Sequence, residues 1–83
     1  MIVDVVRVEV LEGHRLRLGF DDGTEGVVDI GRMVPFEGVF AALKDPDVFA
    51  QVRVDADLGT IAWPNGADLD PVVLHQAAIK RGT

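Results

Sequence analysis

The chain has 83 residues and a formal net charge of −6, and 48% of its residues are hydrophobic. This length allows a single domain over residues 1–83, and the acidic balance disfavours direct binding of nucleic acid, which basic patches recognise. There is no cysteine, and hence no disulfide or thiolate metal site is expected. No apolar run approaches the roughly 20 residues of a membrane span, and no signal-peptide pattern opens the chain. A cytoplasmic protein is therefore expected.

Three strands joined by tight turns are predicted in the first thirty residues. The ranges 2–11, 15–21 and 24–30 alternate apolar with polar residues, the period of two that is typical of a half-buried strand. The dipeptide Asp22-Gly23 is a strong hairpin signal, and consecutive strands with short turns form an antiparallel meander. The alternating apolar residues of the three strands are Val6, Val8, Val10, Leu16, Leu18, Phe20, Val28 and Ile30.

Short helical turns and a second hairpin are predicted next. Residues 31–38 form a loop with room for one helical turn, helical spacing follows from Val39 to Leu43, and Asp45 caps a second turn with Pro46 in its first position. The ranges 51–55 and 60–63 then predict a hairpin around Asp57-Leu58-Gly59.

The last predicted element is a helix from Asp70-Pro71 to about Lys80. Asp70 is a favourable N-cap, and Lys80 suits the negative end of the helix dipole. Its expected buried stripe is Val73, Leu74, Ala77 and Ala78. The expected fold is therefore α+β: an antiparallel three-strand meander, a short helix, a second β-hairpin and a C-terminal helix packed on the sheet.

The residue types present exclude whole classes of catalysis. The chain has no serine, cysteine or tyrosine, so the usual covalent nucleophiles are missing and no enzyme is expected. His14 is predicted to be a solvated turn residue and His75 a residue of the helix surface. The pair Asp21-Asp22 is better explained as a turn than as a catalytic pair of carboxylates. The run 55–59 is likewise better explained as a hairpin turn than as a calcium-binding loop. No cofactor or metal ligand is predicted.

The most promising polar cluster precedes the last helix. Trp63, Asn65, Asp68 and Asp70 lie close together in the sequence, and a polar loop beside an indole could hold a cation or a peptide amine. The alternative is structural: Asp70 would cap the free N–H groups of the helix and Asp68 would favour its dipole. Both interpretations stay open.

The order of motifs resembles a known family. The stretch Leu18-Gly19-Phe20-Asp21-Asp22-Gly23 is followed by Gly26-Val27-Val28-Asp29-Ile30, and later by the run from Trp63-Pro64-Asn65-Gly66 to Asp70-Pro71. Together they resemble the bacterial domain-of-unknown-function family numbered 2442, over about residues 3–78. The resemblance implies a small α+β domain without established catalytic residues. It also implies a binding module, because related domains occur beside a second small protein in an arrangement like a toxin–antitoxin pair.

The sequence therefore leaves two alternative functions. The first is an interaction or regulatory domain, the antitoxin-like half of a two-protein system, whose partner is a neighbouring gene product or a second copy. The second is a domain that binds a small ligand or a metal through residues 63–70. The acidic charge and a mean hydropathy of +0.23 favour the first, since both suit a surface that another protein covers.

Overall fold

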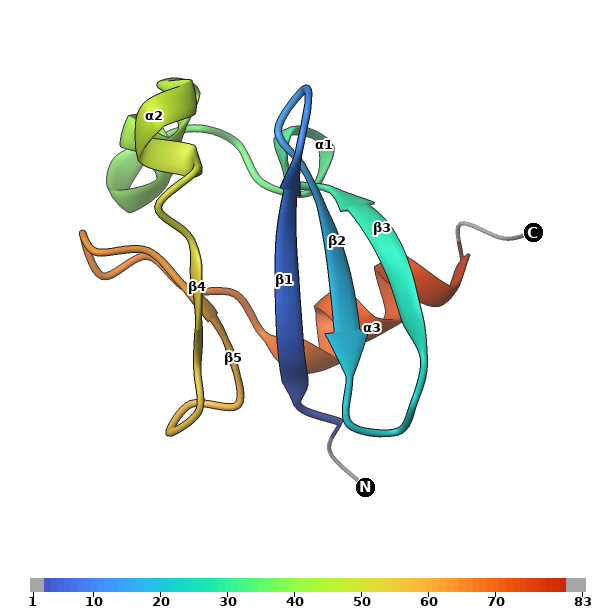
Figure 1. The fold of residues 1–83 in the computed structure, drawn as a ribbon. Coiled ribbons are helices and arrows are strands. Elements are labelled where there is room, and N and C mark those ends of the chain that lie inside the picture. Colours follow the sequence, from blue (N-terminus) through green and yellow to red (C-terminus); the bar gives the residue numbers. More distant parts are fainter. Residues whose placement is uncertain (1–2, 81–83) are drawn as a thin grey trace.

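The computed structural model describes residues 3–80 and has the predicted α+β fold (Figure 1). The predicted first strand begins at Ile2, which lies outside the described residues. The strands are β1 (Val5–Leu11), β2 (Arg15–Phe20), β3 (Glu25–Asp29), β4 (Arg53–Asp55) and β5 (Thr60–Ala62). The helices are α1 (Ile30–Met33), the 3-10 helix η1 (Gly38–Lys44), α2 (Pro46–Phe49) and α3 (Pro71–Lys80).

The first three strands form the predicted antiparallel meander, in the order β1-β2-β3. Gly23 closes the β2–β3 turn at φ 88, a left-handed conformation that glycine adopts without strain. The β1–β2 turn needs two such residues in succession, Gly13 at φ 72 and His14 at φ 60. The carbonyl of His14 accepts a hydrogen bond from the N–H of Ile30 at 2.9 Å, which ties this turn to the start of α1.

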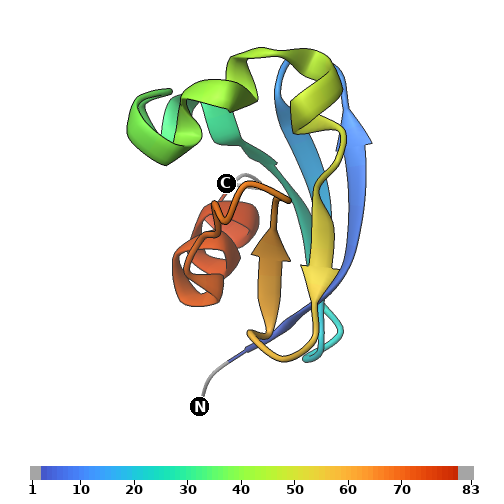
Figure 2. The same cartoon turned by 90° about the vertical axis from the view of Figure 1, so that its left-hand side faces the viewer.

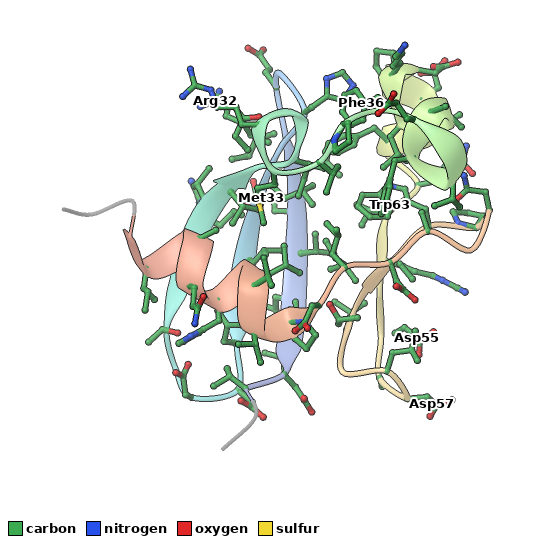
Figure 3. The ribbon with its side chains drawn as sticks, turned by 180° about the vertical axis from the view of Figure 1, so that it is seen from behind. Arg32, Met33, Phe36, Asp55, Asp57 and Trp63 are labelled. Atoms are coloured by element: carbon green, nitrogen blue, oxygen red, sulfur yellow. The ribbon has the colours of Figure 1, made fainter. Side chains whose placement is uncertain are left out.

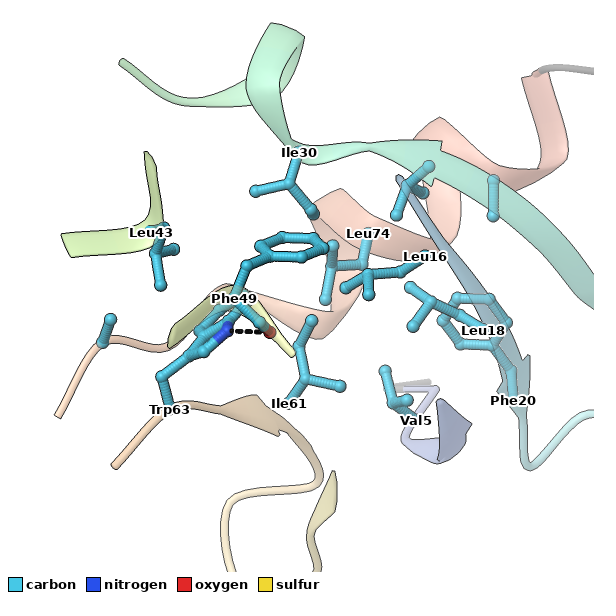
Figure 4. Packing of buried hydrophobic residues seen from close by; sticks show 13 residues of the cluster. Val5, Leu16, Leu18, Phe20, Ile30, Leu43, Phe49, Ile61, Trp63 and Leu74 are labelled. Carbon is cyan, nitrogen blue, oxygen red and sulfur yellow. Dashed lines mark hydrogen bonds between the residues drawn. The ribbon is translucent and has the colours of Figure 1, made fainter. Parts of the chain in front are cut away.

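One face of the meander forms the core of the molecule (Figure 4). Leu16 and Leu18 of β2 are fully buried, and so is Leu74, which α3 contributes from the other side. Burying a side chain of this size stabilises the fold by about 1.5–3 kcal/mol. The core residues predicted from the alternation in β2 and β3, namely Leu16, Leu18, Phe20, Val28 and Ile30, are all buried.

Strand β1 departs from the alternation that its sequence predicts. The register shifts at its start, because Val5 pairs with Phe20 while Arg7 pairs with Gly19, so Val6 is an extra residue in a bulge. Val5 occupies the core position, whereas Val6 and Val10 are exposed. The prediction of a regularly half-buried strand was therefore wrong for Val6, because the bulge puts Val5 in the core position instead. Val10 lies opposite Leu16, on the core side of the sheet, but is exposed near the end of an edge strand.

The second hairpin, β4–β5, lies beside the lower end of β1 (Figure 2). The N–H of Val5 donates to the carbonyl of Gly59 at 2.9 Å, and this contact joins the two sheets. The turn 56–59 is closed by the carboxylate of Asp55, which accepts from the N–H groups of Asp57 and Leu58. This is the turn geometry expected from the sequence.

Helix α3 crosses the core face of the meander next to β3 (Figure 3). The approach is close at Gly26, where a Cβ atom would lie 2.6 Å from the carbonyl oxygen of Ala78. Leu74 and Ala78 are buried as predicted, but Val73 is 51% exposed. The predicted stripe was wrong at Val73 because Val72, Val73 and Ile79 place apolar residues on the side away from the sheet as well, so the sequence does not single out one buried face.

Candidate functional site

The backbone of residues 63–70 leads from β5 into α3 through a tight turn. The N–H of Gly66 donates to the carbonyl of Trp63 at 3.0 Å, and the N–H of Trp63 donates to the carbonyl of Ala67 at 2.9 Å. Beyond the turn Asp68 pairs with Ala62 in an isolated β-bridge. This tight turn fixes the directions in which the side chains of the four predicted site residues point, namely Trp63, Asn65, Asp68 and Asp70.

Trp63 belongs to the core. Its side chain is 1% exposed, and its indole N–H donates to the carbonyl of Phe49 at 3.0 Å (Figure 4). A buried indole needs such a partner for its single donor. The bond joins the end of β5 to α2, 14 residues earlier in the chain, so the indole is directed away from the surface on which the two aspartates lie.

Asn65 and Asp70 both make structural hydrogen bonds. The side-chain amide of Asn65 donates to the carbonyl of Val39 at 2.9 Å and accepts from the N–H of Ala67, which holds η1 against the turn. The carboxylate of Asp70 accepts from the N–H of Val72 at 2.8 Å and caps the start of α3. The capping role expected for Asp70 is confirmed, and its second carboxylate oxygen makes no hydrogen bond within the described residues.

Asp68 and Asp70 line a groove of about 490 Å³ at the N-terminal end of α3. Its other lining residues are Leu58, Thr60, Leu69, Pro71 and Val72. Both aspartates are exposed, and within residues 3–80 neither carboxylate forms an ion pair. Leu58 and Val72 expose apolar surface beside them. An apolar groove edged by carboxylates suits a lysine or arginine side chain, whose stem is apolar and whose tip is cationic.

The groove continues onto the outer face of α3, which we define as Val72, Val73, Gln76 and Ile79. These four positions are exposed and repeat at helical spacing, while Leu74 and Ala78 lie on the opposite side. No Asp, Glu, Lys or Arg occurs between Pro71 and Ile79. Lys80 follows at the last position of the helix. The face was missed in the sequence because the expected buried stripe assigned Val73 to the core.

The two histidines lie at opposite ends of β2. The ring of His14 packs between those of Phe36 and Phe49, with centroids 5.1 and 4.9 Å away, and its Nε2 is buried without a hydrogen-bond partner. The prediction of a solvated turn histidine was wrong, because α2 and the loop after α1 fold over the ring. His75 is on α3 as predicted, and its Nε2 lies 3.0 Å from the carboxylate of Asp22.

The carboxylate of Asp22 joins the β2–β3 turn to α3. The hydroxyl of Thr24 donates to it at 2.6 Å and the Thr24 N–H at 3.0 Å, on the oxygen opposite the one that contacts His75. These two bonds, followed by the interaction with His75, hold the pKa of Asp22 below its ordinary value of 3.8. Because the hydroxyl of Thr24 donates to the carboxylate and not to the imidazole, the trio lacks the order of a nucleophile–base pair.

A second hollow, of about 540 Å³, lies over the uncovered face of the meander. Its charged residues pair with one another: Arg7 with Glu25, and Arg17 with Glu9 at 3.6 Å. The guanidinium of Arg7 rests over Gly19, where a side chain would collide with it. Since the charges cancel and the pairs are exposed, this face offers no net field for a charged ligand.

Within residues 3–80, no three His, Asp or Glu side chains lie close enough together to hold a metal ion. Over the same range no helix is long and apolar enough to cross a membrane.

Comparisons with known proteins agree with the motifs in the sequence. A search of curated proteins and a search of solved structures each found no match. A family model described as a protein of unknown function, DUF2442, matches residues 5–80. The match covers both hairpins, the groove and the outer face of α3, and the chain therefore belongs to the DUF2442 family.

Proposed function

We propose that this domain functions by binding another protein chain, and that it uses the groove at the start of α3 together with the outer face of α3. The observation that carries the proposal is the exposure of Val72, Val73 and Ile79 on a helix that bears no charge from Pro71 to Ile79. Exposed helix faces are ordinarily polar, and contiguous apolar surface of this kind is characteristic of interaction sites.

The groove indicates the chemistry of the partner. Asp68 and Asp70 lie beside Leu58 and Val72, so the surface suits a segment that carries both basic and apolar side chains. The net charge of −6 adds long-range attraction, which raises the rate of encounter with a basic protein. We therefore propose that the domain is the regulatory, antitoxin-like half of a two-protein system, with a basic neighbouring gene product as the other half.

A non-enzymatic role is consistent with the hydrogen bonds that the hydroxyl groups of Thr24 and Thr60 make within the described residues. The hydroxyl of Thr24 donates to Asp22, and that of Thr60 donates to the carbonyl of Leu69 at 2.6 Å. Both stabilise turns or strand ends. Neither hydroxyl is bound by an imidazole that would activate it as a nucleophile.

The proposal is tested by tagging the chain in its native cell and comparing two variants. Val73→Asp places a charge on the outer face of α3, whereas Val39→Asp places it on η1, where the native side chain is similarly exposed at 47%. We expect a basic protein to co-purify with the wild type and with Val39→Asp, and to be lost with Val73→Asp. Equal recovery of that protein with all three chains would contradict the proposal.

A second candidate function is the binding of a small cationic ligand in the same groove. Its support is the pair of carboxylates at Asp68 and Asp70 in a hollow of about 490 Å³. Calorimetric titration with polyamines and with divalent cations tests it, with Asp68→Asn as the matched control. Because Trp63 is buried on another side of this segment, its fluorescence is a poor reporter for this groove.

A further inference from the structure

The exposed dipeptide Asn65-Gly66 has a chemical reactivity that the proposed function does not use. Asn65 is the only asparagine of the chain, and the residue after it is a glycine. Gly66 adopts φ 93, and an added Cβ there would meet no atom within 4 Å beyond its chain neighbours. Because glycine has no side chain to shield its backbone nitrogen, that nitrogen is well placed to attack the side-chain amide of the preceding asparagine.

The reaction that such an attack starts is deamidation. The backbone nitrogen of Gly66 loses its proton and bonds to Cγ of Asn65, while the side-chain nitrogen of Asn65 takes up a proton and leaves as ammonia. Water then opens the resulting cyclic succinimide at one of its two carbonyl groups, which yields aspartate or isoaspartate. The whole sequence consumes only water, so it requires no cofactor and no second protein.

Three hydrogen bonds of the native turn oppose this reaction. The N–H of Gly66 donates to the carbonyl of Trp63 at 3.0 Å, so the attacking nitrogen is held with its proton in place. The side-chain amide of Asn65 donates to the carbonyl of Val39 at 2.9 Å and accepts from the N–H of Ala67 at 3.1 Å, so Cγ is also held. Both reacting groups must be released before they can combine, and this requires the turn to open.

We infer that Asn65 is a deamidation site that the folded turn keeps latent, and that deamidation releases η1 from the turn. The inference goes beyond the proposed function and does not depend on it, because Asn65 lies outside both the groove and the outer face of α3. Since the protecting turn begins at Trp63, the modification records openings of the segment that anchors the buried indole.

The modified chain loses the link between the turn and η1. An aspartate has only acceptors, so a carboxylate oxygen replaces the donor that faces the carbonyl of Val39, and the two oxygens repel each other. An isoaspartate also adds a methylene group to the main chain, which lengthens the turn that Trp63 and Gly66 close. Neither product returns to the amide by itself, so the release of η1 is permanent.

Peptide mapping by mass spectrometry tests where the reaction occurs. The purified chain is incubated at mildly alkaline pH, once folded and once in guanidinium chloride, and the conversion of amide to acid is followed at each position. We expect Asn65 to convert at least about tenfold faster in the denatured chain, because the three hydrogen bonds of the turn are then broken. Equal rates in the two samples, or no conversion of Asn65 in either, would overturn the inference.

A variant of the folded chain tests the dependence on opening. Trp63→Phe loosens the anchor of the segment, so we expect its Asn65 to convert roughly tenfold faster than in the folded wild type. Leu58→Ala, in the turn between β4 and β5, is the control and should leave the rate unchanged. If Trp63→Phe did not accelerate the conversion, opening of this segment would not be the limiting step.

A second pair of variants tests the release of η1. Asn65→Asp places the product in the turn from the start, whereas Gln76→Glu makes the same change from amide to acid on α3 and adds the same charge. We expect hydrogen exchange of the amide protons of η1 to be about tenfold faster in Asn65→Asp than in the wild type, and unchanged in Gln76→Glu. Equal exchange in both variants would show that deamidation does not release η1.

Discussion

Trp63 shows how one side chain can anchor a small fold. Its indole fills the space between β5 and α2, and its N–H reaches across 14 residues of sequence to the carbonyl of Phe49. The run Trp63-Pro64-Asn65-Gly66 is therefore a structural motif in this chain: Asn65 binds η1 and the turn holds the indole in place. The carboxylates that follow are the part of the segment that remains available at the surface.

Replacing the indole should lower stability substantially. Trp63→Phe removes buried volume and the only donor of the side chain, so we expect the free energy of unfolding to fall by about 2–4 kcal/mol. Urea denaturation followed by far-UV circular dichroism measures this without relying on tryptophan emission. Leu58→Ala, at an exposed position, is the control and should change stability by less than about 1 kcal/mol. An unchanged unfolding midpoint for Trp63→Phe would refute this account of the core.

The carboxylate of Asp22 predicts how stability depends on pH. Hydrogen bonds from Thr24, with a contribution from His75, lower its pKa in the folded state below the ordinary value of 3.8. The unfolded chain then binds the proton more readily, so this contribution to stability is complete above pH 3.8 and is lost as the pH falls through the lower folded-state pKa. Asp22→Asn should flatten this part of the curve of stability against pH.

Urea unfolding midpoints measured across that acidic range test the prediction. Asp21→Asn is the matched control, because Asp21 adjoins Asp22 in the same turn but does not contact His75. If Asp21→Asn flattened the curve and Asp22→Asn did not, the assignment of this pH dependence would be wrong.

At the scale of elements, the contact between α3 and β3 depends on a missing side chain. A Cβ at Gly26 would lie 2.6 Å from the backbone oxygen of Ala78, and backbone cannot move aside as a side chain can. Gly26→Ala should therefore displace α3 and cost about 1–3 kcal/mol of stability. Gly19→Ala on the other face should cost less, because it meets only the flexible tip of Arg7. Thermal melting of the two variants compares them; equal losses would contradict this explanation.

The elements most faithfully predicted from the sequence were those fixed by local chemistry. The turn at Gly23 and the caps by Asp45 and Asp70 each depend on residues a few positions apart, and all three occur as expected. The bulge at Val6 could not be predicted, because it arises from how β1 meets both β2 and the β4–β5 hairpin. The exposed side of α3 could not be predicted either, since apolar residues lie both on the side that faces the sheet and on the side that faces away from it.

The candidate site was predicted only in part, because its surface also depends on contacts between residues far apart in the sequence. Asp68 and Asp70 line the groove. Trp63 and Asn65 are close to them in the sequence, but the tight turn directs their side chains to the backbone carbonyls of α2 and η1 instead. Leu58 joins the groove from the β4–β5 turn, a long-range neighbour that no local pattern reveals. Proximity in the sequence therefore identified the segment 63–70, but it could not predict which of its side chains line the groove.

At the scale of the whole molecule, the outer face of the meander and the outer face of α3 differ in the side chains that they expose to a partner. The outer face of the meander carries charges that pair within the chain, as Arg7 does with Glu25. The outer face of α3 exposes Val72, Val73 and Ile79 and carries no charged residue before Lys80. Val6, Val10, Val39 and Leu58 are exposed elsewhere, but Val72, Val73 and Ile79 share one side of a single helix, opposite the self-paired charges, and that side is where we place the interaction.

The most direct test of this central claim measures whether the outer face of α3 is covered in solution. In a methyl-labelled sample, a soluble paramagnetic agent broadens the signals of methyl groups that contact solvent. With the co-purified partner bound, we expect the methyl groups of Val73 and Ile79 to be protected relative to that of Val39, and to lose this protection in the isolated chain. Broadening of Val73 and Ile79 equal to that of Val39 with the co-purified partner bound would contradict the account.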